Sequence, residues 1–330
     1  MNKIDYEKLL KQVLKYYNKN KPTIPERVLD FNEDRIIKVL QRHYSQILQM
    51  LVNTLQYTGG DFSNISAITE MELMRQIEEK LSLMEAELQE EISDYINKQY
   101  VNGQLNHYIA TTGNTDYNAV LNEFPFASIN WYKAEQLIAD TMDDLLFATN
   151  NTKKSIKRVI RDTVGKHIQL NALQGESYKT IKRLIIKDLQ KKGLSEKITK
   201  SGFVGVVDKS GRKWGLKNYT DMVVKTKTHQ AYIEGIKAQC IETGKDLAVI
   251  PHKGATDPCK NFEGMIISMT GVNTNYPSYE QLKATNLIFH PRCKHNVIPI
   301  ASAEALHEDD LKYHKEQLKN LKKISKKVKK

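Results

Sequence analysis

The sequence lacks the cysteine content, the apolar runs and the leader segment of a secreted or membrane-embedded protein. Its three cysteines, Cys240, Cys259 and Cys293, form an odd and sparse set, which argues against a disulfide scaffold and favours a reducing cytoplasm. No window approaches about 18 consecutive apolar residues, so we expect neither a transmembrane helix nor a membrane anchor. The opening residues, MNKIDYEKLLKQ, are amphipathic from the start and predict no secretion signal.

The short motifs of the common enzyme classes are also missing. The sequence contains no phosphate-binding P-loop, no GxSxG, no HExxH and no glycine fingerprint for a dinucleotide. With 40% hydrophobic and 27% charged residues, the composition is that of a globular protein, and 330 residues suffice for two compact units. We therefore predict a folded protein that is not an enzyme.

The charge that is present, a net +11, is unevenly distributed along the chain. Residues 61–100 carry ten acidic and three basic residues, whereas residues 151–200 carry fourteen basic and four acidic residues. The last twenty residues add nine lysines and one glutamate. Lysine suits loose contact with phosphates, whereas base reading would favour arginine. The basic stretches therefore either contact DNA non-specifically or form solvated helix faces. The candidate DNA contacts in the tail are Lys319, Lys322, Lys323, Lys326, Lys327, Lys329 and Lys330.

Helical periodicity dominates the first two hundred residues. In YEKLLKQVLKYY the apolar residues from Leu9 to Tyr17 recur at helical spacing, and Asn32 can cap a second helix. Thr69 and Glu72 have capping-box spacing, and we expect an acidic helix from there to about Tyr100. The polar, glycine-dotted segment VNGQLNHYIATTGNTDYN follows, and we expect it to form a loop or a short hairpin. Further helices are predicted over residues 131–148, 152–173 and 175–193.

The pattern changes after residue 200, where short β-prone runs alternate with turns. FVGVVDKSGRKWGL predicts a hairpin, and residues 218–244 predict a helix that ends at a glycine. DLAVIPH, EGMIISMTG and NVIPI predict strands, YPSYEQLKATN predicts a short helix or turn, and a helical tail follows. The sequence thus predicts an α+β fold. Its parts are a long helical N-terminal region (1–200), a small mixed α/β module (201–300) and a basic helical tail (301–330).

A group of metal-ligand residues falls on the strand ends and loops of this module. A zinc site needs about four such ligands in a tetrahedral array, but no CxxC pair is present. Two residues apart on extended backbone, Cys293 and His295 would face opposite sides unless the chain turns there. Two hypotheses remain open: a zinc site, or buried cysteines with hydrogen-bonded histidines and no cofactor. The candidate metal ligands are His252, Cys259, His290, Cys293 and His295, with Asp257 in the same cluster.

Three segments carry a resemblance to a known family. They are VVDKSGRKWGLKNYTDMVVKTKTHQAYIEG, VIPHKGATDPCKNFEGMIISMTG and LIFHPRCKHNVIPI, which together span most of Phe203 to Ile300. In combination they resemble the phage minor capsid protein 2 family and are similar to the wider group of Mu F-like phage head morphogenesis proteins. Where that group often has a cysteine pair and a closing Cys-x-Cys, this chain has Thr256 with Cys259 and then Cys293-x-His295.

The resemblance implies a structural role in head assembly of a tailed bacteriophage. Such a protein is expected to bind the portal protein, to meet the major capsid or scaffold protein, and to contact packaged DNA non-specifically. Its expected location is the interior of the phage head in the virion, after assembly in the host cytoplasm. Two alternatives are a zinc-dependent, nuclease-like enzyme centred on the cysteines and histidines, and a host-directed effector delivered with the phage genome.

Overall fold

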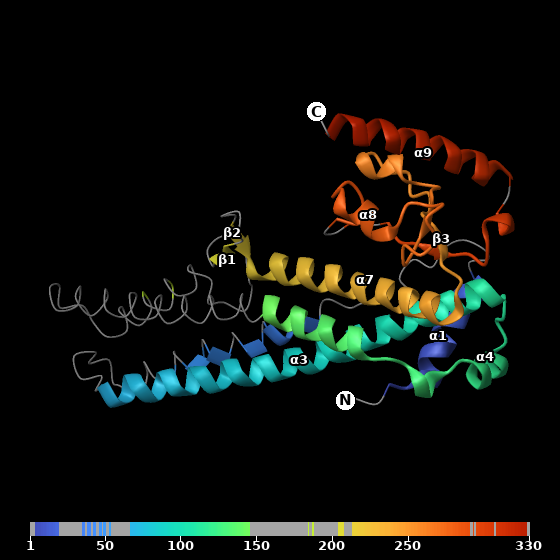
Figure 1. The fold of residues 1–330 in the computed structure, drawn as a ribbon. Helices are drawn as coiled ribbons and strands as arrows, with labels where there is room; N and C mark the ends of the chain where they lie inside the picture. Colours follow the sequence, from blue (N-terminus) through green and yellow to red (C-terminus); the bar gives the residue numbers. More distant parts are fainter. Residues whose placement is uncertain are drawn as a thin grey trace. The chain divides into compact units, whose positions relative to one another are not determined.

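The structure is a computed structural model, drawn as a ribbon in Figure 1. The chain divides into two compact units. The first unit comprises Met1–Phe31, Asp94–Ile138 and Lys225–Lys330, and the second comprises Asn32–Ser93 and Ala139–Val224. The predicted functional division at residues 200 and 300 stays a prediction. The described residues are 4–19, 35–36, 38–40, 42–43, 46–47, 49–50, 53, 67–145, 184, 187, 204–207, 213–290, 293, 295–306 and 308–328.

The fold is mostly helical with a small antiparallel sheet in the C-terminal half, which confirms the predicted α+β class. The predicted helices over 152–173 and 175–193 lie almost wholly outside the described residues. In the described part of the predicted 131–148 helix, residues 132–145 are helical. Among the described residues, no helix combines the length and the apolar character needed to cross a membrane.

Helix α3, Ala67–Thr112, is 46 residues long and contributes to both units. The predicted loop or hairpin after Tyr100 is wrong, because the helix continues for three more turns. Val101, Leu105 and Ile109 are buried at helical spacing there, and their burial outweighs the weak helix propensity of the intervening polar residues. The buried amide nitrogen of Asn106 donates to the Asn102 side-chain and carbonyl oxygens, at 2.6 and 2.8 Å, so this donor finds its partners within the helix.

In the second unit, the acidic half of α3 faces the helical residues of the 35–53 segment. Arg35 contacts Glu91 at 2.8 Å, and Arg42 and His43 both contact Glu87. The excess of acidic residues in α3 is therefore partly matched by a basic neighbour. The predicted hairpin is confirmed in this unit: β1, Val204–Val207, pairs antiparallel with β2, Lys213–Gly215.

In the first unit, short elements cover the C-terminal half of α3. They are α1 (Tyr6–Lys19), α4 (Tyr117–Glu123) and the 3-10 turn η2 (Phe126–Ser128). The predicted stripe of α1 is buried, with Leu9, Leu10, Val13 and Leu14 in one apolar cluster with α3 and α4. Burial of this stripe provides the main driving force for docking α1.

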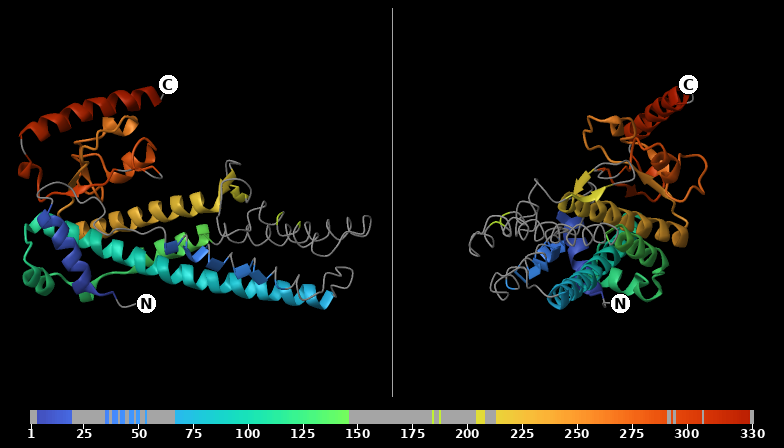
Figure 2. Two further views of the ribbon diagram at one scale, coloured as in Figure 1. Left: turned by 180° about the vertical axis from the view of Figure 1, so that it is seen from behind. Right: turned by 90° about the vertical axis from the view of Figure 1, so that its left-hand side faces the viewer.

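Helix α7, Leu216–Thr243, runs beside α3 in the first unit and touches it backbone to backbone (Figures 1 and 2). A Cβ added to Gly103 would lie 2.0 Å from the carbonyl oxygen of Tyr232, and one added to Gly235 would lie 2.0 Å from that of Tyr100. The contact is reciprocal, because each glycine meets the carbonyl three residues before the other glycine. Only glycine allows helices to approach this closely.

The sheet has the order β4-β3-β5, and both pairings are antiparallel. Its strands are β3 (Leu247–Val249), β4 (Ile266–Ser268) and β5 (Ile298–Pro299), so the three predicted strands are confirmed. The connecting elements are η3 (Pro258–Asn261), α8 (Tyr279–Ala284) and η4 (Ala303–Ala305), and α9 (Glu308–Val328) closes the chain. Buried residues of α7, including Tyr232, Ile233 and Ile236, share one core with the sheet and α8.

Two carboxylates, the half-buried Asp246 and the buried Glu263, organise the loops of this module. Asp246 accepts hydrogen bonds from the Thr270 amide at 2.8 Å and hydroxyl at 2.7 Å, and also from the Ser268 hydroxyl. It thereby fixes the chain as it leaves β4. The second carboxylate, Glu263, belongs to the candidate site described below.

The close contact between α3 and α7 predicts whether a substitution at Gly103 raises or lowers the free energy of unfolding. Gly103→Ala should lower the free energy of unfolding by about 3 kcal/mol or more, because the helices must separate. Helix propensity alone would instead stabilise the chain by about 1 kcal/mol. Gly244→Ala is the matched control, since Gly244 has a φ of 71° but nothing within 4 Å of its added Cβ. Its expected cost is the backbone strain of about 1–2 kcal/mol. Denaturant unfolding followed by circular dichroism measures both, and a stabilised Gly103→Ala variant would contradict the crossing.

Candidate functional site

Three of the predicted ligand residues converge in the buried interior of the C-terminal module. The donor atoms of Cys259, Cys293 and His295 all lie within 4.8 Å of one another. The two sulfurs are 3.9 Å apart, and the Cys293 sulfur lies 3.6 Å from Nδ1 of His295. The three residues are only 1%, 8% and 3% exposed. A pair of thiols and an imidazole is thus enclosed in the core.

A second group shares Cys259 with this cluster. The donor atoms of Asp257, Cys259 and His290 also lie within 4.8 Å of one another. Nε2 of His290 is 3.5 Å from the Cys259 sulfur. The carboxylate of Asp257 accepts the backbone N–H of Cys259 at 3.0 Å and so caps η3. Asp257 therefore has a structural task, whereas the imidazole of His290 adjoins the sulfur directly.

Cys293 and His295 meet on one side of the chain, because the Cys293 sulfur lies 3.6 Å from Nδ1 of His295. The backbone N–H of Cys293 donates to the carbonyl of His290 at 2.9 Å, and Phe289 has a φ of 56°. Extended backbone would have sent alternate side chains to opposite faces. The contact between Cys293 and His295 shows that the backbone here does not alternate in that way, which the sequence alone left open.

Glu263 supports the cluster, and it was not among the site residues predicted from the sequence. Its Oε1 lies 2.9 Å from Nε2 of His295 and accepts the backbone N–H groups of Lys253 at 2.8 Å and Ala255 at 3.1 Å. This contact leaves Nδ1 of His295 to face the sulfur of Cys293. The sequence signal for this residue was an acidic residue inside the apolar run FEGMI. An acidic residue exposed at the surface would give the same pattern, so the signal did not identify a buried carboxylate.

The ionisable groups of the site shift one another's pKa values. Burial opposes ionisation of Glu263, but the hydrogen bonds from His295, Lys253 and Ala255 outweigh it and lower the pKa of this carboxyl. Burial also opposes charge on Cys293 and His295, yet their mutual hydrogen bond lowers the pKa of the thiol and raises that of the imidazole. Burial, reinforced by the adjacent Cys293, raises the pKa of Cys259.

His252 is the one candidate ligand outside both donor groups. Its side chain is 54% exposed, and Nδ1 lies 3.9 Å from Oε2 of Glu263. Its ring packs edge-on against Tyr313 of α9, with the ring centres 4.7 Å apart. Gly264, with a φ of 76°, lies beneath both rings, and a Cβ there would come within 2.4 Å of Tyr313. His252 therefore helps to pack α9 against the site.

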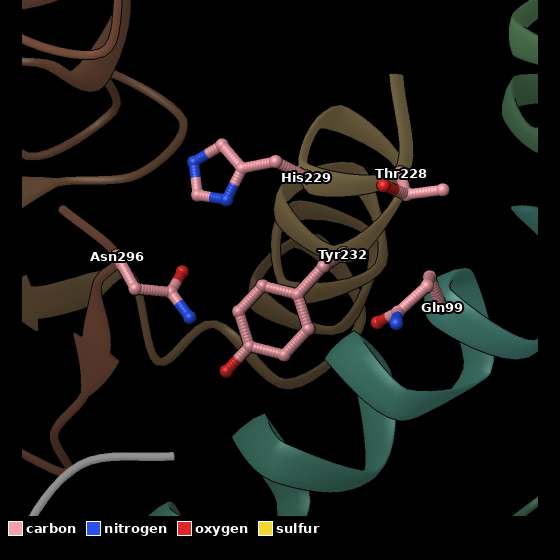
Figure 3. A pocket seen from close by; sticks show the side chains of 5 residues that line it. All are labelled: Gln99, Thr228, His229, Tyr232 and Asn296. Carbon is pink, nitrogen blue, oxygen red and sulfur yellow. The ribbon is translucent and has the colours of Figure 1, made fainter. Parts of the chain in front are cut away.

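A small cavity lined by polar residues lies beside α7 and the segment before β5 (Figure 3). Its volume of about 10 Å³ is that of roughly one water molecule. Figure 3 shows Gln99 reaching it from α3, Asn296 from the segment before β5, and three side chains from α7. The α7 residues are Thr228, His229 and Tyr232. This cavity is too small for an organic substrate.

The candidate DNA contacts fall on α9 and its end. Lys319 is exposed. Lys322, Lys323, Lys326 and Lys327 lie within α9, but their side chains lie outside the described residues, as do Lys329 and Lys330 altogether. The first half of α9 is packed on the module, with His314 and Gln317 buried.

Comparison with known proteins identifies the family. The family model for phage minor capsid protein 2 matches residues 24–329, which is nearly the whole chain. The chain belongs to the phage minor capsid protein 2 family. The suspected resemblance is confirmed, and it extends well beyond Phe203–Ile300. Family membership gives the chain a structural role in a bacteriophage capsid. No curated protein and no solved structure matches it significantly.

His314 predicts a pH dependence of stability. The backbone N–H of Ile266 donates to Nδ1 of His314 at 2.9 Å, so this nitrogen must be unprotonated. Burial, with a smaller contribution from Lys315, lowers the pKa of His314 in the folded state. Because the unfolded pKa is about 6.5, the stability from neutral His314 is complete above that pH and is lost as the pH falls below it.

The measurement compares denaturant unfolding of the wild type and His314→Gln between pH 5 and pH 8. Glutamine is neutral throughout, so the wild type should lose more of its free energy of unfolding than the variant as the pH falls. Parallel pH profiles for the two proteins would show that His314 does not titrate in this way.

Proposed function

We propose that this minor capsid protein binds the portal or inner capsid surface of a tailed phage and contacts packaged DNA non-specifically. The observation that carries the proposal is the family match over residues 24–329. The partners are the portal protein and the major capsid or scaffold protein, and the location is the interior of the phage head. The protein acts as a structural component in head assembly, which takes place in the host cytoplasm.

The charge distribution supports the DNA contact. The last twenty residues hold nine lysines and one glutamate, and α9 continues to Val328 with its first half anchored on the module. Tyr313 and His314 hold that half against Gly264 and Ile266. A lysine-rich helix that is fixed at one end can present its charges to phosphates without reading bases. This geometry suits a protein that lies between a protein shell and packaged DNA.

The lysines of the tail should set the salt dependence of DNA binding. Replacing the seven candidate lysines by glutamine should weaken binding uniformly across sequences. It should also reduce the slope of log K against log salt by up to about six, because each phosphate contact contributes about 0.9. The control replaces exposed Lys8, Lys11 and Lys15 of α1 by glutamine, which lowers the net charge elsewhere. A fluorescence titration over a salt series gives the slopes, and an unchanged slope in the tail variant would refute the contact.

Portal association is tested separately from DNA binding. An affinity-tagged full chain should retain the portal protein from nuclease-treated lysate of infected cells, and deletion of the gene should abolish infectious particles while host growth is normal. Supplying the intact gene in trans should restore them. Normal particle yield and infectivity after deletion would contradict a role in head assembly. Failure to retain portal protein with infectivity lost would instead direct attention to the capsid or scaffold protein.

A further inference from the structure

We propose that the C-terminal module binds one structural zinc ion through Cys259, Cys293, His295 and His290. This inference goes beyond the assembly role, because it concerns what holds the module together and would stand if the portal contact were disproved.

The donor spacing fits the edges of a zinc tetrahedron. With Zn–S bonds of about 2.3 Å and Zn–N bonds of about 2.0–2.1 Å, a tetrahedral site requires sulfurs about 3.8 Å apart and sulfur–nitrogen separations of about 3.5 Å. The Cys259–Cys293 sulfurs are 3.9 Å apart. The Cys293–His295 and Cys259–His290 separations are 3.6 and 3.5 Å. Three of the six edges are therefore already at metal-binding length.

The fourth ligand is His290, which stands beside Cys259 and belongs to the second donor group with Asp257. It competes for that position with the Asp257 carboxylate, which is already engaged as the cap of η3. Imidazole is also the better match to a thiolate-rich site than a carboxylate. The donor atom of His290 lies within 4.8 Å of the Cys259 sulfur but does not share one such group with Cys293 and His295, so binding requires the His290 side chain to rotate toward them.

Glu263 orients the site in the way that outer carboxylates orient metal-binding histidines. It contacts Nε2 of His295 at 2.9 Å, which leaves Nδ1 to bind the ion. Two backbone N–H groups, from Lys253 and Ala255, hold the carboxylate itself in place. The imidazole therefore has its ring orientation and tautomer fixed before any ion arrives.

The arrangement favours a structural ion over a catalytic one. Four protein ligands leave no open position for a water or substrate, and the two sulfurs and His295 are buried. The ion would join η3 to the segment before β5, between residues 34 apart in sequence. Two thiolates with two imidazoles in tetrahedral array select zinc over the harder calcium and magnesium ions.

The test measures metal in the full-length protein, expressed in zinc-supplemented medium and purified without chelator. Elemental analysis should find about one zinc per chain, and Co²⁺ substitution should give the visible spectrum of a tetrahedral thiolate site. Cys259→Ser and Cys293→Ser should each lose the metal. Cys240→Ser is the matched control, because Cys240 is an equally buried free cysteine outside the cluster. Glu263→Gln should retain zinc with an affinity about 10–100-fold lower.

Several outcomes would overturn the inference. One is wild-type protein without stoichiometric zinc, and another is zinc retained by the Cys259→Ser, Cys293→Ser double variant. An iron–sulfur spectrum or a Cys259–Cys293 disulfide in the purified protein would also exclude it. Unchanged affinity in His290→Asn would remove His290 from the ligand set. If the cysteine variants do not fold, the wild type decides: chelation should lower its Tm, and Zn²⁺ but not Mg²⁺ should restore it. A Tm that is indifferent to chelation counts against the ion.

Discussion

The backbone contact between α3 and α7 at Gly103 and Gly235 is the constraint on which the first unit depends. With no side chain between them, the two helices place their neighbouring residues on a common apolar surface. On one side, Val101, Leu105 and Ile109 of α3 bury α1 and α4. On the other side, Tyr232, Ile233 and Ile236 of α7 pack into the core of the sheet module. A wider crossing would open both cores. The close packing of both cores therefore depends on the absence of side chains at Gly103 and Gly235.

In the sheet module, hydrogen bonds to two side-chain carboxylates compensate for the very short strands. The three strands have three, three and two residues, so the ladder between them supplies few hydrogen bonds. Asp246 holds the chain after β4, and Glu263 holds the loop after β3 through the amides of Lys253 and Ala255. A carboxylate withdrawn from water needs several donors, and both the half-buried Asp246 and the buried Glu263 have them. The loops are thereby fixed in place by side chains.

Local patterns predicted much of the fold, and long-range contacts account for what was missed. Periodic leucines and valines identified α1, and turn residues identified the β1–β2 hairpin and the three strands. The break predicted after Tyr100 was wrong because asparagine and glycine read as loop residues locally. Gly103 is explained only by α7, some 130 residues later. Likewise, the candidate ligands could be named from residue type, but their convergence and the contact of Glu263 with His295 become visible only in the folded chain.

The proposed zinc ion would compensate for the short strands. A module with so little sheet needs another way to hold η3 against the segment before β5, and the thiol pair at 3.9 Å already joins them. Without an ion, two buried thiols and two imidazoles provide weak and partly competing hydrogen bonds. With an ion, the same four groups would form strong directional bonds. The buried Glu263 would then orient His295 as a metal ligand. The cost of burying that carboxylate is easier to understand when it orients a metal ligand than when it serves only the two amides.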